Sequence, residues 1–101
     1  RDRGTARQCL DAASTVLMNM LGLVCDPVGG LVECPCQMRN ASGVANALTA
    51  AEIVLSGVRQ LIPFDEMLDA MYTAGKRLPA EYRETALGGF AATSTGCSLC
   101  Q

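Results

Sequence analysis

The hydrophobic residues recur with helical spacing in three segments of the chain. Residues 5–21 are good helix formers, with Thr5 as a candidate N-cap and Gly22 as the residue that ends the helix. A second helix is predicted from residue 40 or 41 to residue 56, with Asn40 and Ser42 at its cap and Gly57 after its end. A third helix is predicted to begin at Pro63, and we expect it to end at Gly75.

Each predicted helix has an apolar face that we expect to be buried. These faces consist of Leu10, Ala13, Leu17, Met20 and Leu21, broadened by Cys9, Ala12 and Val16; of Val44, Ala47, Leu48, Ala51, Val54 and Leu55; and of Phe64, Met67, Leu68, Met71 and Tyr72. In the third helix Asp65, Glu66 and Asp69 lie in the first two turns, where the helix dipole favours acidic residues. This predicts a solvated face there and not an acidic active site.

The segments between the helices are rich in glycine and proline. Residues 22–37 contain Asp26-Pro27, Gly29-Gly30 and Pro35, which indicates a structured loop. A short helical turn is predicted at residues 81–85, and the tail after Gly88-Gly89 is small, polar and uncharged. No strand pattern appears. The predicted fold is therefore all-α, a helical bundle fragment with a cysteine-bearing loop between its first two helices.

The composition indicates contacts beyond this chain. Half of the 101 residues are apolar, which is more than a free-standing domain of this size usually needs. The first residues, Arg1-Asp2-Arg3, include no initiator Met and no apolar signal core. We therefore expect a piece of a longer protein, packed against more helices of the same subunit.

The charge pattern argues against nucleic acid and membrane partners. The formal net charge is −2, and the charged residues are scattered, so no basic stripe or polybasic segment is present. The longest apolar stretch, residues 16–25, is interrupted by Asn19 and closed by Asp26. It is well short of the roughly 20 residues that a helical membrane span needs.

The sequence has six cysteines and no histidine, which narrows the possible chemistry. Cysteines at this density indicate a disulfide framework in a secreted protein, or metal binding or catalysis in a reducing cytosol; the long helical segments favour the second. The absence of histidine excludes Ser-His and Cys-His nucleophiles and His-ligated zinc. A four-thiolate zinc site is one alternative, formed by Cys34, Cys36, Cys97 and Cys100, and unligated buried cysteines are another.

Several blocks of sequence, taken in order, closely resemble the alpha (catalytic) part of bacterial iron–sulfur L-serine dehydratases. The first block is Leu21-Gly22-Leu23-Val24-Cys25-Asp26-Pro27-Val28-Gly29-Gly30-Leu31-Val32-Glu33, followed by Pro35-Cys36 and Arg39-Asn40. The later blocks are Ile62-Pro63, Asp65-Glu66, Asp69-Ala70-Met71-Tyr72, Arg83-Glu84-Thr85-Ala86 and Gly88-Gly89. The resemblance covers nearly the whole chain from about Thr5, and it implies that residues 1–101 are the C-terminal portion of the alpha domain.

The resemblance implies a 4Fe-4S cluster held by three cysteine thiolates, with one iron left open for substrate. Cys25 and Cys36 match two of these ligands, and the third is expected upstream of this chain. Cys9 and Cys34 depart from the family pattern, so we expect them to be small buried residues. Some relatives end in a cysteine that folds back onto the open iron. Cys100, next to the last residue, is the first candidate for that part, and Cys97 is the second.

The implied activity is a lyase that deaminates L-serine to pyruvate and ammonia, with the open iron as Lewis acid. Arg39 and Arg83 are candidates for binding the substrate carboxylate, and Glu84 is a candidate base; ordinary ion pairs are the alternative role of each. The implied partners are L-serine, the rest of the alpha domain, a beta or regulatory domain or subunit, and further copies in an oligomer, in the cytoplasm. A small structural zinc or interaction module and a folded but inert piece of the dehydratase are the competing hypotheses.

Overall fold

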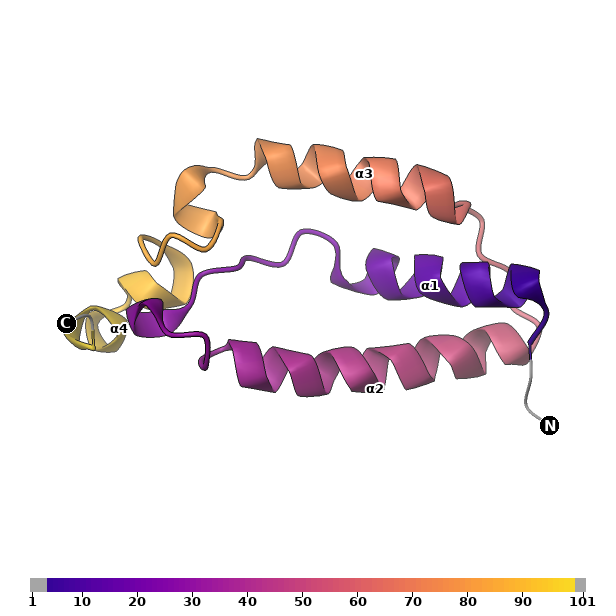
Figure 1. The fold of residues 1–101 in the computed structure, drawn as a ribbon, viewed down its shortest axis with the longest axis horizontal. Helices are drawn as coiled ribbons and strands as arrows, with labels where there is room; N and C mark the ends of the chain where they lie inside the picture. The colour runs from indigo at the N-terminus through magenta and orange to yellow at the C-terminus, as the bar shows by residue number, and fades with distance from the viewer. Residues whose placement is uncertain (1–3, 100–101) are drawn as a thin grey trace. The chain divides into compact units, whose positions relative to one another are not determined.

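The computed structural model describes residues 4–99, and they form four α-helices (Figure 1). These are α1 (Ala6–Met20), α2 (Cys36–Leu55), α3 (Phe64–Arg77) and α4 (Ser94–Ser98), with single 3-10 turns η1 (Val28–Gly30), η2 (Ala80–Tyr82) and η3 (Gly89–Ala92). Within these residues there is no named strand, and the β-type pairing is an isolated parallel bridge between Cys25 and Arg83. The all-α prediction is confirmed.

The described residues divide into two compact units. Residues 4–21 and 42–76 form unit 1, and residues 22–41 and 77–99 form unit 2. Helix α2 contributes its first residues, 36–41, to unit 2 and the remainder to unit 1. The cysteine-bearing loop predicted from the sequence therefore belongs to unit 2, together with the C-terminal segment.

Helix α1 has the boundaries that the sequence predicts. The Gln8 backbone N–H donates to the Thr5 hydroxyl at 3.1 Å, and the Thr5 N–H donates to the Gln8 side-chain oxygen at 2.9 Å. This reciprocal pair is a capping box, which satisfies two backbone donors that a helix start otherwise leaves unpaired. Gly22 follows the helix with φ of +84°, a conformation that glycine adopts without strain.

Helix α2 begins earlier than the sequence pattern suggests. The backbone N–H groups of Gln37 and Arg39 donate to the carbonyls of Glu33 and Pro35 at 2.8 and 2.9 Å, so helical bonding is already in place at Cys36. Proline suits the start of a helix because no N–H is needed there. The prediction that Asn40 and Ser42 cap this helix is wrong, since both lie inside it.

Three other boundaries differ from the predictions. Helix α3 runs on to Arg77, because Gly75 keeps a helical conformation. The turn expected at residues 81–85 is the shorter η2, Ala80–Tyr82. The polar tail contains α4, whose first turn is capped by the Thr93 hydroxyl, which accepts the Gly96 N–H at 3.0 Å.

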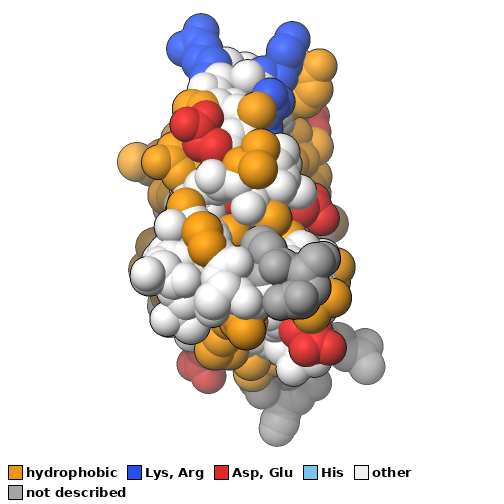
Figure 2. All heavy atoms as spheres, turned by 90° about the vertical axis from the view of Figure 1, so that its left-hand side faces the viewer, with side chains coloured by type: hydrophobic (Ala, Val, Ile, Leu, Met, Phe, Trp, Pro, Cys, Tyr) orange, Lys and Arg blue, Asp and Glu red, His pale blue; other side chains and the backbone are white. Residues whose placement is uncertain are grey.

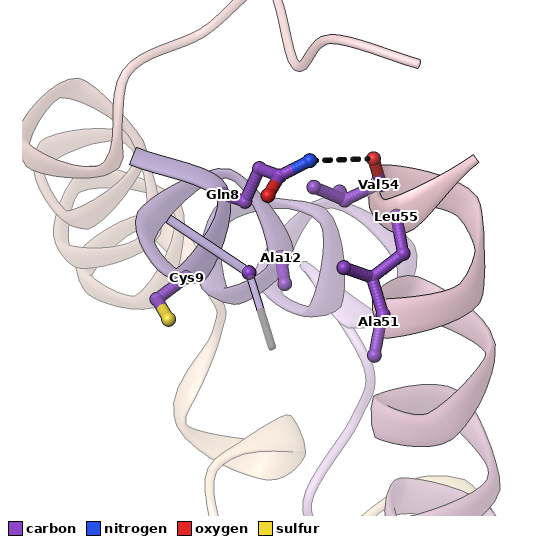
Figure 3. Close-up of a pocket in the computed structure, with 7 residues that line it drawn as sticks. Gln8, Cys9, Ala12, Ala51, Val54 and Leu55 are labelled. Atoms are coloured by element: carbon purple, nitrogen blue, oxygen red, sulfur yellow. Dashed lines mark hydrogen bonds between the residues drawn. The ribbon is translucent and has the colours of Figure 1, made fainter. Parts of the chain in front are cut away.

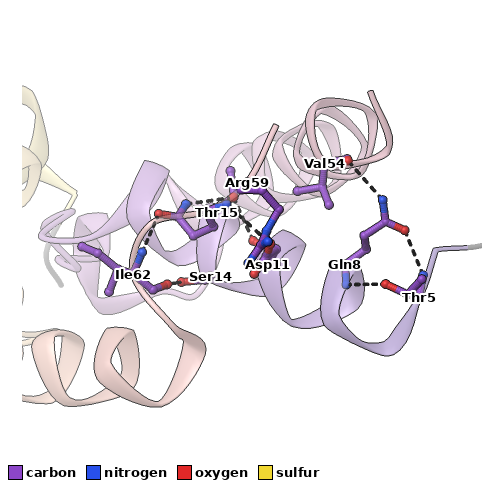
Figure 4. Close-up of polar contacts among 9 residues, drawn as sticks. Thr5, Gln8, Asp11, Ser14, Thr15, Val54, Arg59 and Ile62 are labelled. Atoms are coloured by element: carbon purple, nitrogen blue, oxygen red, sulfur yellow. Dashed lines mark hydrogen bonds and ion pairs between the residues drawn. The ribbon is translucent and has the colours of Figure 1, made fainter. Parts of the chain in front are cut away.

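Unit 1 is held together largely by polar contacts on α1 (Figure 4). The connection after α2 packs on the helix: the Arg59 Nε donates to an Asp11 carboxylate oxygen at 3.0 Å, and the Ser14 hydroxyl donates to the Ile62 carbonyl at 2.7 Å. Asp11 and Ser14 are buried. Helices α1 and α2 lie alongside each other, and the Gln8 amide donates to the Val54 carbonyl at 3.4 Å.

The prediction that the apolar faces are buried is wrong for most of their large residues. Val54 and Met67 are buried, but Leu10 is 52% exposed, Leu48 66% and Tyr72 67%. Figure 2 shows hydrophobic side chains at several places on the surface. The physical reason is that no element among the described residues covers these faces, and α1 turns its polar side toward its neighbours instead. The same residues contain no helix that is both long and apolar enough to cross a membrane.

We expect Asp11→Ala to lower the free energy of unfolding by about 1–3 kcal/mol, because it leaves Arg59 and the connection without their buried acceptor. Asp69→Ala, at an exposed position on α3, is the matched control and should change stability by less than about 0.5 kcal/mol. Urea unfolding followed by far-ultraviolet circular dichroism measures both. Equal effects of the two substitutions would contradict this account of unit 1.

Candidate functional site

Unit 2 is organised around the carboxylate of Asp26, which is 1% exposed. One oxygen accepts the backbone N–H of Ala86 at 2.6 Å, and the other accepts that of Gly88 at 2.7 Å. A buried carboxylate needs such donors because burial otherwise removes its hydration without replacement. Asp26 thereby fixes residues 86–88 beside the cysteine-bearing loop.

The backbone of Cys25 binds the same C-terminal segment. Its N–H donates to the Tyr82 carbonyl at 3.2 Å, and its carbonyl accepts the N–H of Glu84. These bonds form the parallel bridge between Cys25 and Arg83. The two sequence blocks that contain Cys25 and Arg83 are thus neighbours in space, joined at two consecutive residues of the loop.

The segment opposite Cys25 has an unusual backbone. Glu84 and Ala86 have φ of 65° and 60°, in the left-handed region. For residues other than glycine this costs about 1–2 kcal/mol each. Two hydrogen bonds to a charged acceptor contribute about 1.5–3 kcal/mol each, so those of Asp26 are of the size needed to offset the strain. Such conformations persist only where the surroundings hold them, and they concentrate at functional sites.

Gly88 is required for a different reason, which is space. A Cβ atom at this position would lie 2.7 Å from the carbonyl oxygen of Glu81. No side chain fits there without a shift of the backbone, so glycine allows the close approach that brings its N–H to Asp26.

Three ionisable side chains surround the Cys25 thiol. Loss of hydration around the sulfur raises the pKa of Cys25 although the residue as a whole is exposed, and electrostatic interactions with Glu84 and with Cys36 raise it further. A hydrogen bond with the Glu84 side chain acts in the same direction, whereas the charge of Arg39 lowers this pKa. Cys25 therefore has a carboxylate, a second thiol and a guanidinium close by.

Cys25, Cys36 and Arg39 line the same small cavity, which has a volume of about 210 Å³. Its lining residues are Cys25, Asp26, Pro35, Cys36, Arg39 and Asn40. The early start of α2 creates this arrangement, because Cys36, Arg39 and Asn40 are spaced three and four residues apart and share one face of the helix. A helix that began at residue 40 would leave Cys36 in an irregular loop.

The two candidate arginines have different surroundings. Arg39 donates to the carbonyl of Val24, and its guanidinium lies over the Phe90 ring, 5.3 Å from the centroid. It thus joins α2 to the loop and to η3. Arg83 is exposed, and its side chain makes no hydrogen bond or ion pair with another described residue. Its guanidinium therefore has donors available.

The structure brings Cys25, Cys36, Arg39 and Glu84 together, and it pairs the backbone of Arg83 with Cys25. The hydrogen-bonding role of Asp26 was not predicted from the sequence, in which Asp26 was noted as part of a turn, as the end of an apolar stretch and as one position of the family motif. Its signal in the sequence is an acidic residue directly after a cysteine and directly before Pro27, in a loop whose other acidic residue is Glu33.

The remaining cysteines do not join this group. The expectation that Cys9 and Cys34 are buried is wrong, since both are exposed. Cys9 is on the part of α1 that lines a cavity of about 190 Å³ with α2, as Figure 3 shows. It is exposed because the apolar side of α1 is not covered.

The C-terminal segment rests on the glycine turn of the loop. A Cβ atom at Gly29, which has φ of +67°, would lie 3.2 Å from the Leu99 carbonyl oxygen. Cys97 in α4 contacts the Ala91 carbonyl at 3.6 Å, while Cys100 lies outside the described residues. Within residues 4–99 no three Cys, Asp or Glu side chains are placed to hold a metal ion together. The described members of the zinc alternative, Cys34, Cys36 and Cys97, are therefore not assembled.

Comparison with known proteins identifies relatives over nearly the whole chain. The chain is 54% identical to the probable L-serine dehydratase alpha chain of Bacillus subtilis, over 95% of this chain and 32% of that protein. It is 53% identical to the L-serine dehydratase alpha chain of Peptoniphilus asaccharolyticus, over 92% of this chain and 32% of that protein. L-serine dehydratase 2 of Escherichia coli is 39% identical over 91% of this chain and 20% of its own length.

The chain thus spans about a third of the length of the two alpha chains. No solved structure matches it significantly. The family model described as serine dehydratase alpha chain matches residues 2–91, which include Cys25, Asp26, Cys36 and the segment from Arg83 to Gly88. The chain belongs to the serine dehydratase alpha chain family.

Proposed function

We propose that this chain is part of an iron–sulfur L-serine dehydratase, a lyase that converts L-serine to pyruvate and ammonia. The relatives named L-serine dehydratase alpha chain support the activity and the substrate. The observation that carries the proposal is the cavity in unit 2, where the thiols of Cys25 and Cys36 meet the side chain of Arg39, with Glu84 beside Cys25.

The residues at this cavity fit part of the ligand set of a 4Fe-4S cluster. Cysteine thiolates are the usual ligands of such clusters, and Cys25 and Cys36 are both free and line the same cavity. The third ligand is proposed to come from the alpha chain outside residues 4–99, since these contain no group of three suitable side chains. Cys100 is proposed as a ligand in the absence of substrate. When bound, the cluster would supply a Lewis acid for the departing hydroxide.

The other residues are proposed to bind the substrate and to move its proton. Arg83 is the better candidate for the substrate carboxylate, because its guanidinium has no partner among the described residues and its fork matches two oxygens. Glu84 is the candidate base for the α-proton, since its carboxylate lies beside Cys25. Arg39 is already bound to Val24 and Phe90, which favours a role in shaping the site.

The exposed apolar faces support packing of this chain against other parts of the enzyme. Leu10, Leu48 and Tyr72 lie on such faces, and the alpha chains of Bacillus subtilis and Peptoniphilus asaccharolyticus are about three times as long as the matched region. We propose that the rest of the alpha domain covers these faces, with a beta or regulatory domain or subunit and an oligomeric enzyme as further partners. A reducing cytoplasm suits a cluster with an exposed iron and free cysteines.

We expect Cys25→Ser and Cys36→Ser, each made in the complete alpha chain, to abolish binding of the cluster. The reason is that a neutral hydroxyl is a poor replacement for a thiolate on iron. Iron and acid-labile sulfide per chain, with the visible spectrum after anaerobic reconstitution, measure this. Cys9→Ser is the matched control and should keep full iron content. Full iron in either of the first two variants would refute their assignment as ligands.

We expect Arg83→Gln to raise the KM for L-serine at least tenfold, because the substrate carboxylate loses a charged, two-pronged donor. Iron content should be unchanged. Arg39→Gln, which removes a contact within the protein, should instead reduce cluster retention with a smaller change in KM. Steady-state kinetics beside iron analysis distinguishes the two, and a normal KM in Arg83→Gln would exclude this role for Arg83.

A further inference from the structure

We propose that Asp26 is the positioning residue of this site, whose carboxylate holds the segment that carries Glu84 against Cys25. This inference rests on the proposed function, in which Cys25 binds the cluster and Glu84 takes part in proton transfer. Asp26 itself touches neither substrate nor cluster in this proposal. Its role is to set the distance between Cys25, which binds the cluster, and Glu84, which acts on the substrate.

Asp26 is close in sequence to Cys25, and the backbone N–H groups that it binds are close in sequence to Glu84. Asp26 follows Cys25 directly, and its carboxylate binds the N–H groups of Ala86 and Gly88, two and four residues after Glu84. The Cys25 carbonyl in turn accepts the N–H of Glu84. The segment 84–88 is therefore bound to residues 25 and 26 at three backbone donors, which leaves the Glu84 backbone little freedom to move away from the thiol.

Two features show that the hold of Asp26 is needed. Glu84 and Ala86 have positive φ, a conformation that relaxes unless the surroundings maintain it. In addition, Asp26 is 1% exposed, so water does not readily replace a lost acceptor. Both carboxylate oxygens of Asp26 accept a backbone N–H. The side-chain amide of asparagine has only one acceptor oxygen, so in Asp26→Asn its NH₂ group faces one of the two backbone N–H groups and that hydrogen bond is lost.

Asp11 provides a matched control. It is also a buried aspartate that binds a segment distant in sequence, through Arg59, but it belongs to unit 1 and is not among the groups that act on Cys25. Asp11→Asn and Asp26→Asn therefore remove the same charge from comparable burial. Only Asp26→Asn should alter the surroundings of Glu84.

The experiment uses the complete alpha chain, with its partner domain or subunit, in wild-type form and as Asp26→Asn, Asp11→Asn, Glu84→Gln and the Asp26→Asn/Glu84→Gln double variant. In the cluster-free proteins, backbone hydrogen exchange of residues 83–89 is measured by mass spectrometry. In the reconstituted enzymes, kcat and KM for L-serine are measured beside iron content. The exchange measurement reads the segment independently of activity and of the cluster.

We expect exchange in residues 83–89 to accelerate roughly tenfold or more in Asp26→Asn and to stay at the wild-type rate in Asp11→Asn. We expect kcat to fall roughly tenfold in Asp26→Asn, with a smaller change in KM. The kcat of the double variant should be no lower than that of Glu84→Gln alone, because the loss of Asp26 cannot misplace a Glu84 carboxylate that has already been removed.

A wild-type rate of hydrogen exchange in residues 83–89 of Asp26→Asn would overturn the proposal. So would a double variant whose kcat falls by the product of the two single decreases. A normal kcat in Glu84→Gln would overturn it too, because Asp26 would then have no catalytic group to position. Failure of the proposed function gives a different result, which is a wild-type enzyme without iron or without lyase activity. In that case the exchange rates still decide whether Asp26 holds the segment.

Discussion

The buried carboxylate of Asp26 is the interaction on which the candidate site depends. It binds the N–H groups of Ala86 and Gly88 and so joins parts of the chain that are about sixty residues apart. Without it, the left-handed backbone of Glu84 would have only the single bond to the Cys25 carbonyl on this side. The carboxylate of Glu84 lies beside the thiol of Cys25 because the carboxylate of Asp26, the residue after Cys25, holds the segment that follows Glu84.

Buried polar groups have an unusually large part in both units. The largest fully buried side chains among the described residues are Asp26 and Ser14, and the buried hydrophobic core there consists of Ala50, Val54, Met67 and Ala91. In unit 1 Asp11 and Ser14 bind the connection after α2, much as Asp26 binds the later segment in unit 2. Buried polar contacts of this kind are directional, so they select one arrangement of the backbone where apolar packing is sparse.

The sequence predicted the three long helices well, because capping residues and apolar periodicity act locally. The capping box of Thr5 and Gln8 is an example, since both partners lie within one turn. The burial of the apolar faces was predicted wrongly. Periodicity shows that Leu10 and Leu48 share faces suited to burial, but it contains no information on which partner covers them. The site residues Cys25 and Cys36 were found through the resemblance to a family, and their roles stay predictions.

By itself, the sequence determined the helical class, the cysteine-bearing loop and the membership of a family, since these depend on composition, local spacing and ordered motifs. Only the tertiary structure decided that α2 begins at Cys36, that Arg39 is already occupied by Val24 and Phe90, and that Asp26 binds Ala86 and Gly88. The physical reason is distance along the chain. Hydrogen bonds between residues 26 and 88 leave no periodic trace, because any buried acceptor can bind any backbone N–H that the fold brings to it.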